Sequence, residues 1–184
     1  MSSRPIVGRD EQLGSIQAFL AEVEQGPAAL VLSGEAGIGK TILWETGVEE
    51  ARERFECVLT CRGVEAEASL SFAGLSEVLV PVFEEAAPSL APPRRRALEI
   101  ALLLAEPGEE APDAHAIGLA VLDVLHALAE RGPVLVALDD AQWLDPASAG
   151  VLQIALRRLR REPVGLLATL RKGPGISTPF QLDG

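Results

Sequence analysis

The hydrophobic positions of this chain alternate between short apolar runs and longer segments in which apolar residues recur at helical spacing. Such alternation predicts an α/β fold in which helices wrap a mainly parallel sheet. Three of the four apolar runs are nearly continuous, as strands buried on both faces are. The predicted strands are 28–33, 55–62, 133–139 and 163–170, and the predicted helices are 10–25, 39–54, 72–86, 94–105, 114–130 and 147–161.

Composition narrows the class of protein. A length of 184 residues indicates one domain with a hydrophobic core that needs no disulfide or metal. The formal net charge of −11 argues against nucleic acid or anionic lipid as the partner of the segment as a whole. The sequence has no secretory signal and no apolar run near the ~18 residues of a membrane helix. We therefore expect a cytoplasmic protein without a membrane partner. Cys57 and Cys61 lie too far apart along one predicted strand for a disulfide and are expected to be buried thiols.

The most specific motif follows the first predicted strand. Residues 34–41 read GEAGIGKT, which matches G-x-x-x-x-G-K-[ST] at every fixed position between a strand and a helix. Glycines let the backbone fold around a phosphate, and the exposed amides of the loop and the helix N-terminus then point at the anion. Lys40 would reach the β- and γ-phosphates, and the Thr41 hydroxyl would bind Mg²⁺. The expected nucleotide-binding residues of the loop are Gly34, Ala36, Gly37, Ile38, Gly39, Lys40 and Thr41.

A pair of carboxylates ends the third predicted strand. The apolar run 134–138 leads directly into Asp139 and Asp140, which is the Walker B arrangement. We expect Asp139 to hold the magnesium shell and Asp140 to orient or deprotonate the attacking water. The alternative is that both are ordinary turn residues, since aspartate is common after strands.

Two polar residues interrupt the end of the fourth predicted strand. Thr169 and Arg171 could sense the γ-phosphate at that strand tip. A plain strand-end threonine and a solvated surface arginine would give the same pattern.

With these elements in place, the chain resembles the ATPase domain of the STAND class of P-loop NTPases, close to the AAA+ group. It is most similar to the version at the N-terminus of large LuxR-type, MalT-like bacterial transcription regulators. The residues that carry the resemblance are VGRD at 7–10, SGEAGIGKT at 33–41 and LDDAQWLDPAS at 138–148, with weaker support from ATLR at 168–171.

This resemblance implies an ATP-loaded switch with a three-layer P-loop sandwich fold, ATP and Mg²⁺ as ligands, and low ATPase activity. It places 7–9, including Arg9, near the adenine or ribose; otherwise Arg9 would be a solvated surface charge. Many AAA+ relatives have glutamate where this chain has Asp140, and the shorter side chain suits a slow switch. Without the resemblance, Asp145 or Ser148 would be a helix cap and Trp143 a packing residue.

Related proteins continue into a fifth strand, a helical lid, a superhelical sensor region and a helix-turn-helix. We therefore expect residues 1–184 to form one ATPase core whose sheet is truncated after the fourth core strand, without lid, sensor repeats or DNA reader. The first strand would be an exposed sheet edge at which another copy could pair. DNA would be contacted only through a region outside this chain.

The sequence is also consistent with two other functions. A nucleotide-dependent scaffold without turnover fits the same motifs, and a small-molecule P-loop kinase would suit the length. A GTPase is disfavoured because Asn-Lys-x-Asp does not occur. The arginines 157, 158, 160 and 161 are expected to complement the C-terminal dipole of their helix rather than to bind nucleic acid, and His115 and His126 are expected to be structural.

Overall fold

The computed structural model describes residues 9–108 and 112–172. Within them, four strands form one sheet in the order β1-β4-β3-β2, and every neighbouring pair is parallel. The strands are β1 (Ala28–Gly34), β2 (Cys57–Arg62), β3 (Val134–Asp139) and β4 (Val164–Arg171). The four predicted strands and the parallel sheet are therefore confirmed. In the described part of the chain, β1 and β2 form the two edges of the sheet.

Six α-helices surround this sheet in the described residues. They are α1 (Asp10–Val23), α2 (Lys40–Arg54), α3 (Ala73–Ala86), α4 (Pro92–Ala101), α5 (Ala114–Ala129) and α6 (Pro146–Leu156), with short 3-10 turns η1 (Glu65–Glu67), η2 (Ala87–Ser89) and η3 (Ala141–Trp143). None of the helices in this described portion is long and apolar enough to cross a bilayer.

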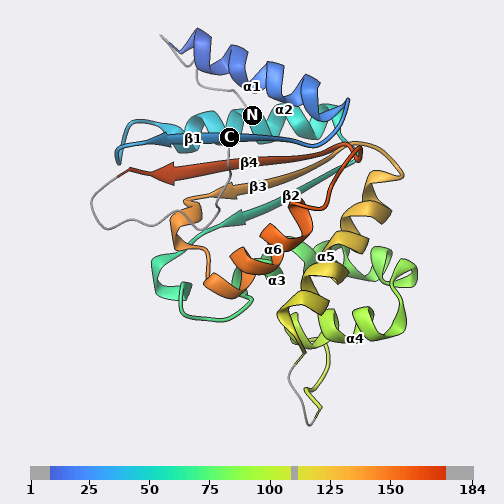
Figure 1. The fold of residues 1–184 in the computed structure, drawn as a ribbon. Coiled ribbons are helices and arrows are strands. Elements are labelled where there is room, and N and C mark those ends of the chain that lie inside the picture. Colours follow the sequence, from blue (N-terminus) through green and yellow to red (C-terminus); the bar gives the residue numbers. More distant parts are fainter. Residues whose placement is uncertain (1–8, 109–111, 173–184) are drawn as a thin grey trace.

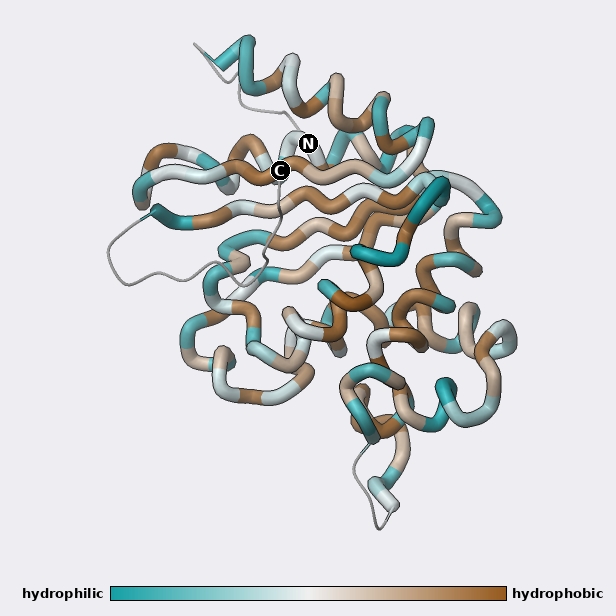
Figure 2. Tube along the Cα trace, viewed as in Figure 1, coloured by the Kyte–Doolittle hydropathy of each residue, from teal (hydrophilic) through white to brown (hydrophobic). Residues whose placement is uncertain are grey.

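The helices cover both faces of the sheet. Figure 1 shows α1 and α2 on one face and α3 to α6 on the other, which gives the expected three layers. Alternating side chains of β3 serve the two faces: Leu135 and Ala137 pack in the core with α1 and α2, whereas Val136 packs in the core with α3 to α6. Each fully buried leucine or valine contributes about 1.5–3 kcal/mol. Figure 2 shows hydrophobic segments running through the strands and through the helices on both sides of the sheet.

Both predicted boundaries of the helix at 94–105 are wrong. Helix α4 begins at Pro92, two residues before the predicted start, because proline fits the first turn of a helix, where its missing N–H is not needed. It ends at Ala101, and Leu103 then adopts the left-handed conformation with φ 59°.

Helix α6 ends at Leu156, five residues before the predicted end at position 161, and this changes the role of the arginines that follow. Arg158 still donates from Nη1 to the carbonyl of Ile154 over 2.8 Å, as a residue complementing the helix C-terminus should. Arg160 and Arg161 lie beyond the helix, and their backbone N–H groups donate to Glu162. The expectation that all four arginines complement the helix dipole is therefore wrong for these two.

A buried aspartate joins the beginnings of two helices. Asp145, 2% exposed, accepts the N–H of Ser148 over 2.9 Å and so caps α6. It also accepts the N–H groups of Phe72 and Gly74, over 2.9 and 3.1 Å, where α3 begins. Ser148 does not cap its own helix; its hydroxyl accepts the N–H of Leu75 over 2.8 Å. This network fixes the segment that follows Asp140.

The carboxyl ends of the parallel strands meet at one edge of the sheet. The register pairs Gly34 with Arg171 on one side and Arg62 with Asp139 on the other. Four residues that end strands are therefore brought together, and in this fold class ligands bind at that edge.

Candidate functional site

The loop between β1 and α2 is built around two left-handed glycines. Gly37 has φ 75° and Gly39 has φ 89°, and a side chain at either position would strain the backbone. A Cβ at Gly39 would also lie 3.2 Å from the Arg9 guanidinium. Helix α2 begins at Lys40, so its first turn of N–H groups points back toward the loop.

The Lys40 ammonium lies within the curve of this loop. Its Nζ donates to the carbonyl of Gly34 over 3.1 Å and to that of Glu35 over 2.9 Å. The backbone N–H groups of residues 35–39 bond to no acceptor within the described residues. Exposed amides beside a fixed positive charge form a cradle that fits a phosphate group.

The metal-binding residues predicted from the sequence lie next to each other. Thr41 Oγ1 is 3.4 Å from Oδ1 of Asp139, although the two residues are 98 positions apart. Asp139 is 1% exposed, and its Oδ1 also accepts the Thr169 hydroxyl over 2.7 Å and the N–H of Asp140 over 3.1 Å. A hydroxyl and a carboxylate are oxygen ligands of the kind that Mg²⁺ prefers, so this donor set fits the metal.

Asp140 has an unusual backbone. Its φ of 49° and ψ of 46° are left-handed, a conformation that aspartate tolerates better than most residues. Its N–H donates to the Thr169 hydroxyl over 2.7 Å, which holds the turn against β4. Its Oδ1 accepts Nε2 of Gln142 over 2.8 Å, and Oε1 of Gln142 accepts the N–H of Arg171 over 3.0 Å.

The two predicted sensor residues occupy different environments. Thr169 is fully buried, and its hydroxyl is engaged by the Asp139 carboxylate and the N–H of Asp140. The Arg171 side chain is exposed at the end of β4, and its backbone meets Gln142. Only Thr169 therefore contacts the carboxylate pair.

Arg9 lies against the loop from the N-terminal side. Its Nη2 donates to the carbonyl of Ile38 and packs over Gly39. The two other residues of this predicted contact, Val7 and Gly8, lie outside the described residues. An open cavity of about 440 Å³ adjoins the loop here; its lining residues are Arg9, Gln12, Val31, Leu32, Ser33, Ile38, Lys40 and Leu43.

Sequence reasoning missed Arg62 and Gln142, which contact the carboxylate pair from either side. Arg62 Nε lies 3.2 Å from Oδ2 of Asp139, and its Nη2 lies 3.2 Å from Oε1 of Glu45. Its guanidinium also lies over the Trp44 ring, 5.9 Å from the centroid. Arg62 ends its strand as Asp139 does, but the adjacency of the two strands is not visible in the sequence.

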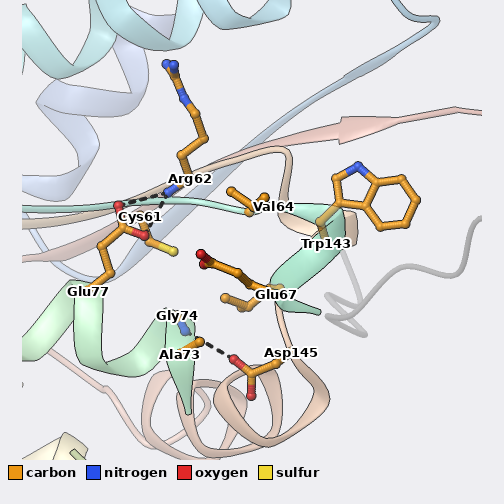
Figure 3. A pocket seen from close by; sticks show the side chains of 11 residues that line it. Cys61, Arg62, Val64, Glu67, Ala73, Gly74, Glu77, Trp143 and Asp145 are labelled. Atoms are coloured by element: carbon orange, nitrogen blue, oxygen red, sulfur yellow. Dashed lines mark hydrogen bonds between the residues drawn. The ribbon is translucent and has the colours of Figure 1, made fainter. Parts of the chain in front are cut away.

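A second, smaller pocket lies at the end of β2 and is lined in part by Arg62. Figure 3 shows Cys61, Glu67, Glu77 and Trp143 around it, with the Arg62 side chain pointing away. Its volume of about 10 Å³ has room for roughly one water, too little for a small molecule.

Burial, followed by the hydrogen bond with Glu77, raises the pKa of the Cys61 thiol, which therefore stays protonated and unreactive. Cys61 is buried as expected, whereas Cys57 is only half-buried; both are free thiols.

The fold and the loop geometry define the class: this is an α/β fold of the P-loop NTPase type. Residues 5–167 match the family model described as AAA ATPase domain, and the chain belongs to that family. Among solved structures it is similar to the ORC2 protein of Aeropyrum pernix, determined in ADPNP-ADP complexes. That likeness has a TM-score of 0.51 and 19% identity, and it covers 94% of this chain and 43% of the other, which supports the fold.

One curated relative is an uncharacterized protein of Rhizobium meliloti (strain 1021). It is 42% identical over 52 residues, which are 28% of this chain and 5% of the relative. The matched segment is thus a small part of a much longer protein.

Proposed function

We propose that this chain is an ATP-binding, slowly hydrolysing switch module of a LuxR-type transcription regulator. The observation that carries the proposal is the 3.4 Å approach of the Thr41 hydroxyl to the Asp139 carboxylate beside the glycine loop. A hydroxyl and a carboxylate of the kind that Mg²⁺ prefers thus lie beside a loop that suits a phosphate, which supports the binding of Mg·ATP.

Each residue of the site then has a role. Lys40 and the amides of the loop bind the phosphates, and Thr41 and Asp139 hold Mg²⁺, which neutralises phosphate charge when bound. Asp140 orients the attacking water or takes its proton. Thr169 and Arg171 respond to the γ-phosphate from the end of β4.

The cavity at Arg9 is the proposed site of the base and ribose. It adjoins Lys40 and is partly lined by apolar side chains of β1, as a flat aromatic base would need. The 184 residues contain no asparagine, and therefore no Asn-Lys-x-Asp element of the kind that recognises guanine. Adenine is therefore the base we propose.

Slow turnover follows from how Asp140 is held. Its side chain is one methylene shorter than the glutamate of many AAA+ proteins, and one carboxylate oxygen is already bonded to Gln142. A general base that lies farther from the attacking water, and that already accepts a hydrogen bond, accelerates hydrolysis less than a longer and unengaged carboxylate would.

The regulator context is proposed from the resemblance at 7–10, 33–41 and 138–148. The long relative, of which the match covers 5%, is compatible with a core that serves a larger protein. In this proposal 1–184 is one ATPase core in the cytoplasm, DNA is contacted elsewhere in the regulator, and copies associate through β1, which pairs only with β4 in the described residues.

The experiment is a calorimetric titration of ATP and of GTP with Mg²⁺, followed by phosphate release over hours. ATP binding with slow release supports the proposal. Binding without release favours a scaffold, release only with an added small acceptor favours a kinase, and the absence of ATP binding overturns the proposal.

A further inference from the structure

The two oxygens of the Asp139 carboxylate have different partners. Oδ1 accepts three donors, from Thr41, Thr169 and the backbone of Asp140. Oδ2 faces the guanidinium of Arg62, at 3.2 Å. A cation that binds Asp139 directly must therefore approach the oxygen that Arg62 already neutralises.

Arg62 is not fixed to this position by burial. Its side chain is 53% exposed, whereas that of Asp139 is 2% exposed. Glu45, itself 52% exposed, binds the other end of the guanidinium at 3.2 Å. Arg62 can therefore leave Asp139 without losing its solvent contact or its second carboxylate partner. The buried Asp139 carboxylate still needs a counter-charge, which an incoming cation would supply.

Simultaneous binding of a metal ion and of the Arg62 guanidinium to Oδ2 of Asp139 is unfavourable. Two cations within a few ångströms repel each other, and most strongly beside a buried carboxylate, where water screens least. Resting on the proposed function, we propose that Arg62 competes with Mg²⁺ for Asp139, and that loading of the metal with ATP displaces Arg62 toward Glu45. Arg62 thus sets how much Mg²⁺ the site requires.

The displacement has an optical reporter. The Arg62 guanidinium lies over the Trp44 ring, and Trp44 is 6% exposed. A cation leaving or shifting over an indole changes the field that the ring experiences. The sequence contains two tryptophans, so a Trp143→Phe background leaves Trp44 as the only one.

The test uses the full chain with Trp143→Phe. ATP binding is measured by calorimetry first in EDTA and then at increasing Mg²⁺, and Trp44 emission is recorded in parallel. With Arg62→Met, the Mg²⁺ concentration for half-maximal binding should fall about fivefold, the scale of a partly exposed ion pair. The Mg²⁺-dependent change in Trp44 emission should be lost.

A second variant, at the exposed Glu45, should shift the Mg²⁺ requirement in the opposite direction and leaves the core residues unchanged. Glu45→Gln removes the exposed carboxylate that receives Arg62, so Arg62 should hold Asp139 more firmly and the Mg²⁺ requirement should rise. Arg54→Met is the matched control for charge, because Arg54 pairs with Glu24 and Glu50 instead. In Arg54→Met, the Mg²⁺ concentration for half-maximal ATP binding should stay within about twofold of the parent's value.

The outcomes separate the two proposals. If the parent binds no ATP with or without Mg²⁺, the proposed function fails. If the parent binds Mg·ATP but Arg62→Met needs as much Mg²⁺ as before, or more, the competition is overturned. It is also overturned if Arg62→Met keeps the Mg²⁺-dependent emission change, or if Arg54→Met lowers the requirement to the same extent.

Discussion

The hydroxyl of Thr169 donates to the carboxylate of Asp139 over 2.7 Å and accepts the N–H of Asp140 over 2.7 Å. One buried side chain on β4 thus fixes both members of the acidic pair at the end of β3. Any change at Thr169 acts on the candidate metal ligand and on the left-handed turn together.

Thr169→Val keeps the shape of the side chain but leaves a buried carboxylate and a backbone N–H each short of a partner. We expect the free energy of unfolding to fall by about 1–3 kcal/mol, measured by urea denaturation. Thr46→Val is the control, because the Thr46 hydroxyl bonds the carbonyl of Ile42 on an exposed helix surface. Equal effects of the two substitutions would contradict this account.

Lys40→Ala removes the ammonium from the loop. The loss of Mg·ATP affinity should exceed about 100-fold, as when one charge of a close pair is removed, while thermal unfolding changes little. Lys172→Ala is the matched control, since it removes the only other lysine of the sequence. Calorimetry that finds both variants equally weakened would count against a phosphate role for Lys40.

Asp140→Asn keeps the size of the side chain but removes its basicity. ATP affinity should stay within about threefold and phosphate release should slow by about 100-fold or more, the usual contribution of a general base. Single-turnover release with saturating Mg·ATP separates the two effects. Unchanged release would assign the proton transfer to another group.

Asp145→Ala leaves three backbone N–H groups at the starts of α3 and α6 without their acceptor. A lost cap and buried unsatisfied donors together should lower the free energy of unfolding by about 3–5 kcal/mol. Asp113→Ala is the control, because Asp113 precedes α5 without a side-chain cap bond. A cost for Asp145→Ala no larger than the control's would refute the double cap.

Glu162 should give a pH-dependent contribution to stability. The backbone N–H groups of Arg160, of Glu162 itself and of Arg161 lower its pKa from 4.5 to about 2. Because the pKa is lowered in the folded state, the stabilisation is present above pH 4.5 and lost as the pH falls toward 2. The difference in unfolding free energy between the parent and Glu162→Gln should shrink from pH 7 to pH 3. A constant difference would contradict this origin.

Much of the site could be predicted because its signals are local. The glycines at 34, 37 and 39 and Lys40 lie within one short segment, and the end of an apolar strand marks Asp139 without knowledge of its neighbours. Arg62 carried no comparable signal, and Gln142 lies in the 138–148 segment of the resemblance without a contact being assigned to it there. The Arg62 contact depends on β2 lying beside β3 and on the register that pairs Arg62 with Asp139. The contact of Gln142 with Arg171 depends instead on β4 lying beside β3.

The sequence by itself determined the α/β class, the parallel strands and the residues of the loop, because hydrophobic period, glycine freedom and charge act over a few neighbouring positions. Only the tertiary structure decided that Asp139 is shared by Thr41, Thr169 and Arg62, and that Asp145 joins two helices. Those contacts join segments far apart in sequence, and the order and register of the strands select them.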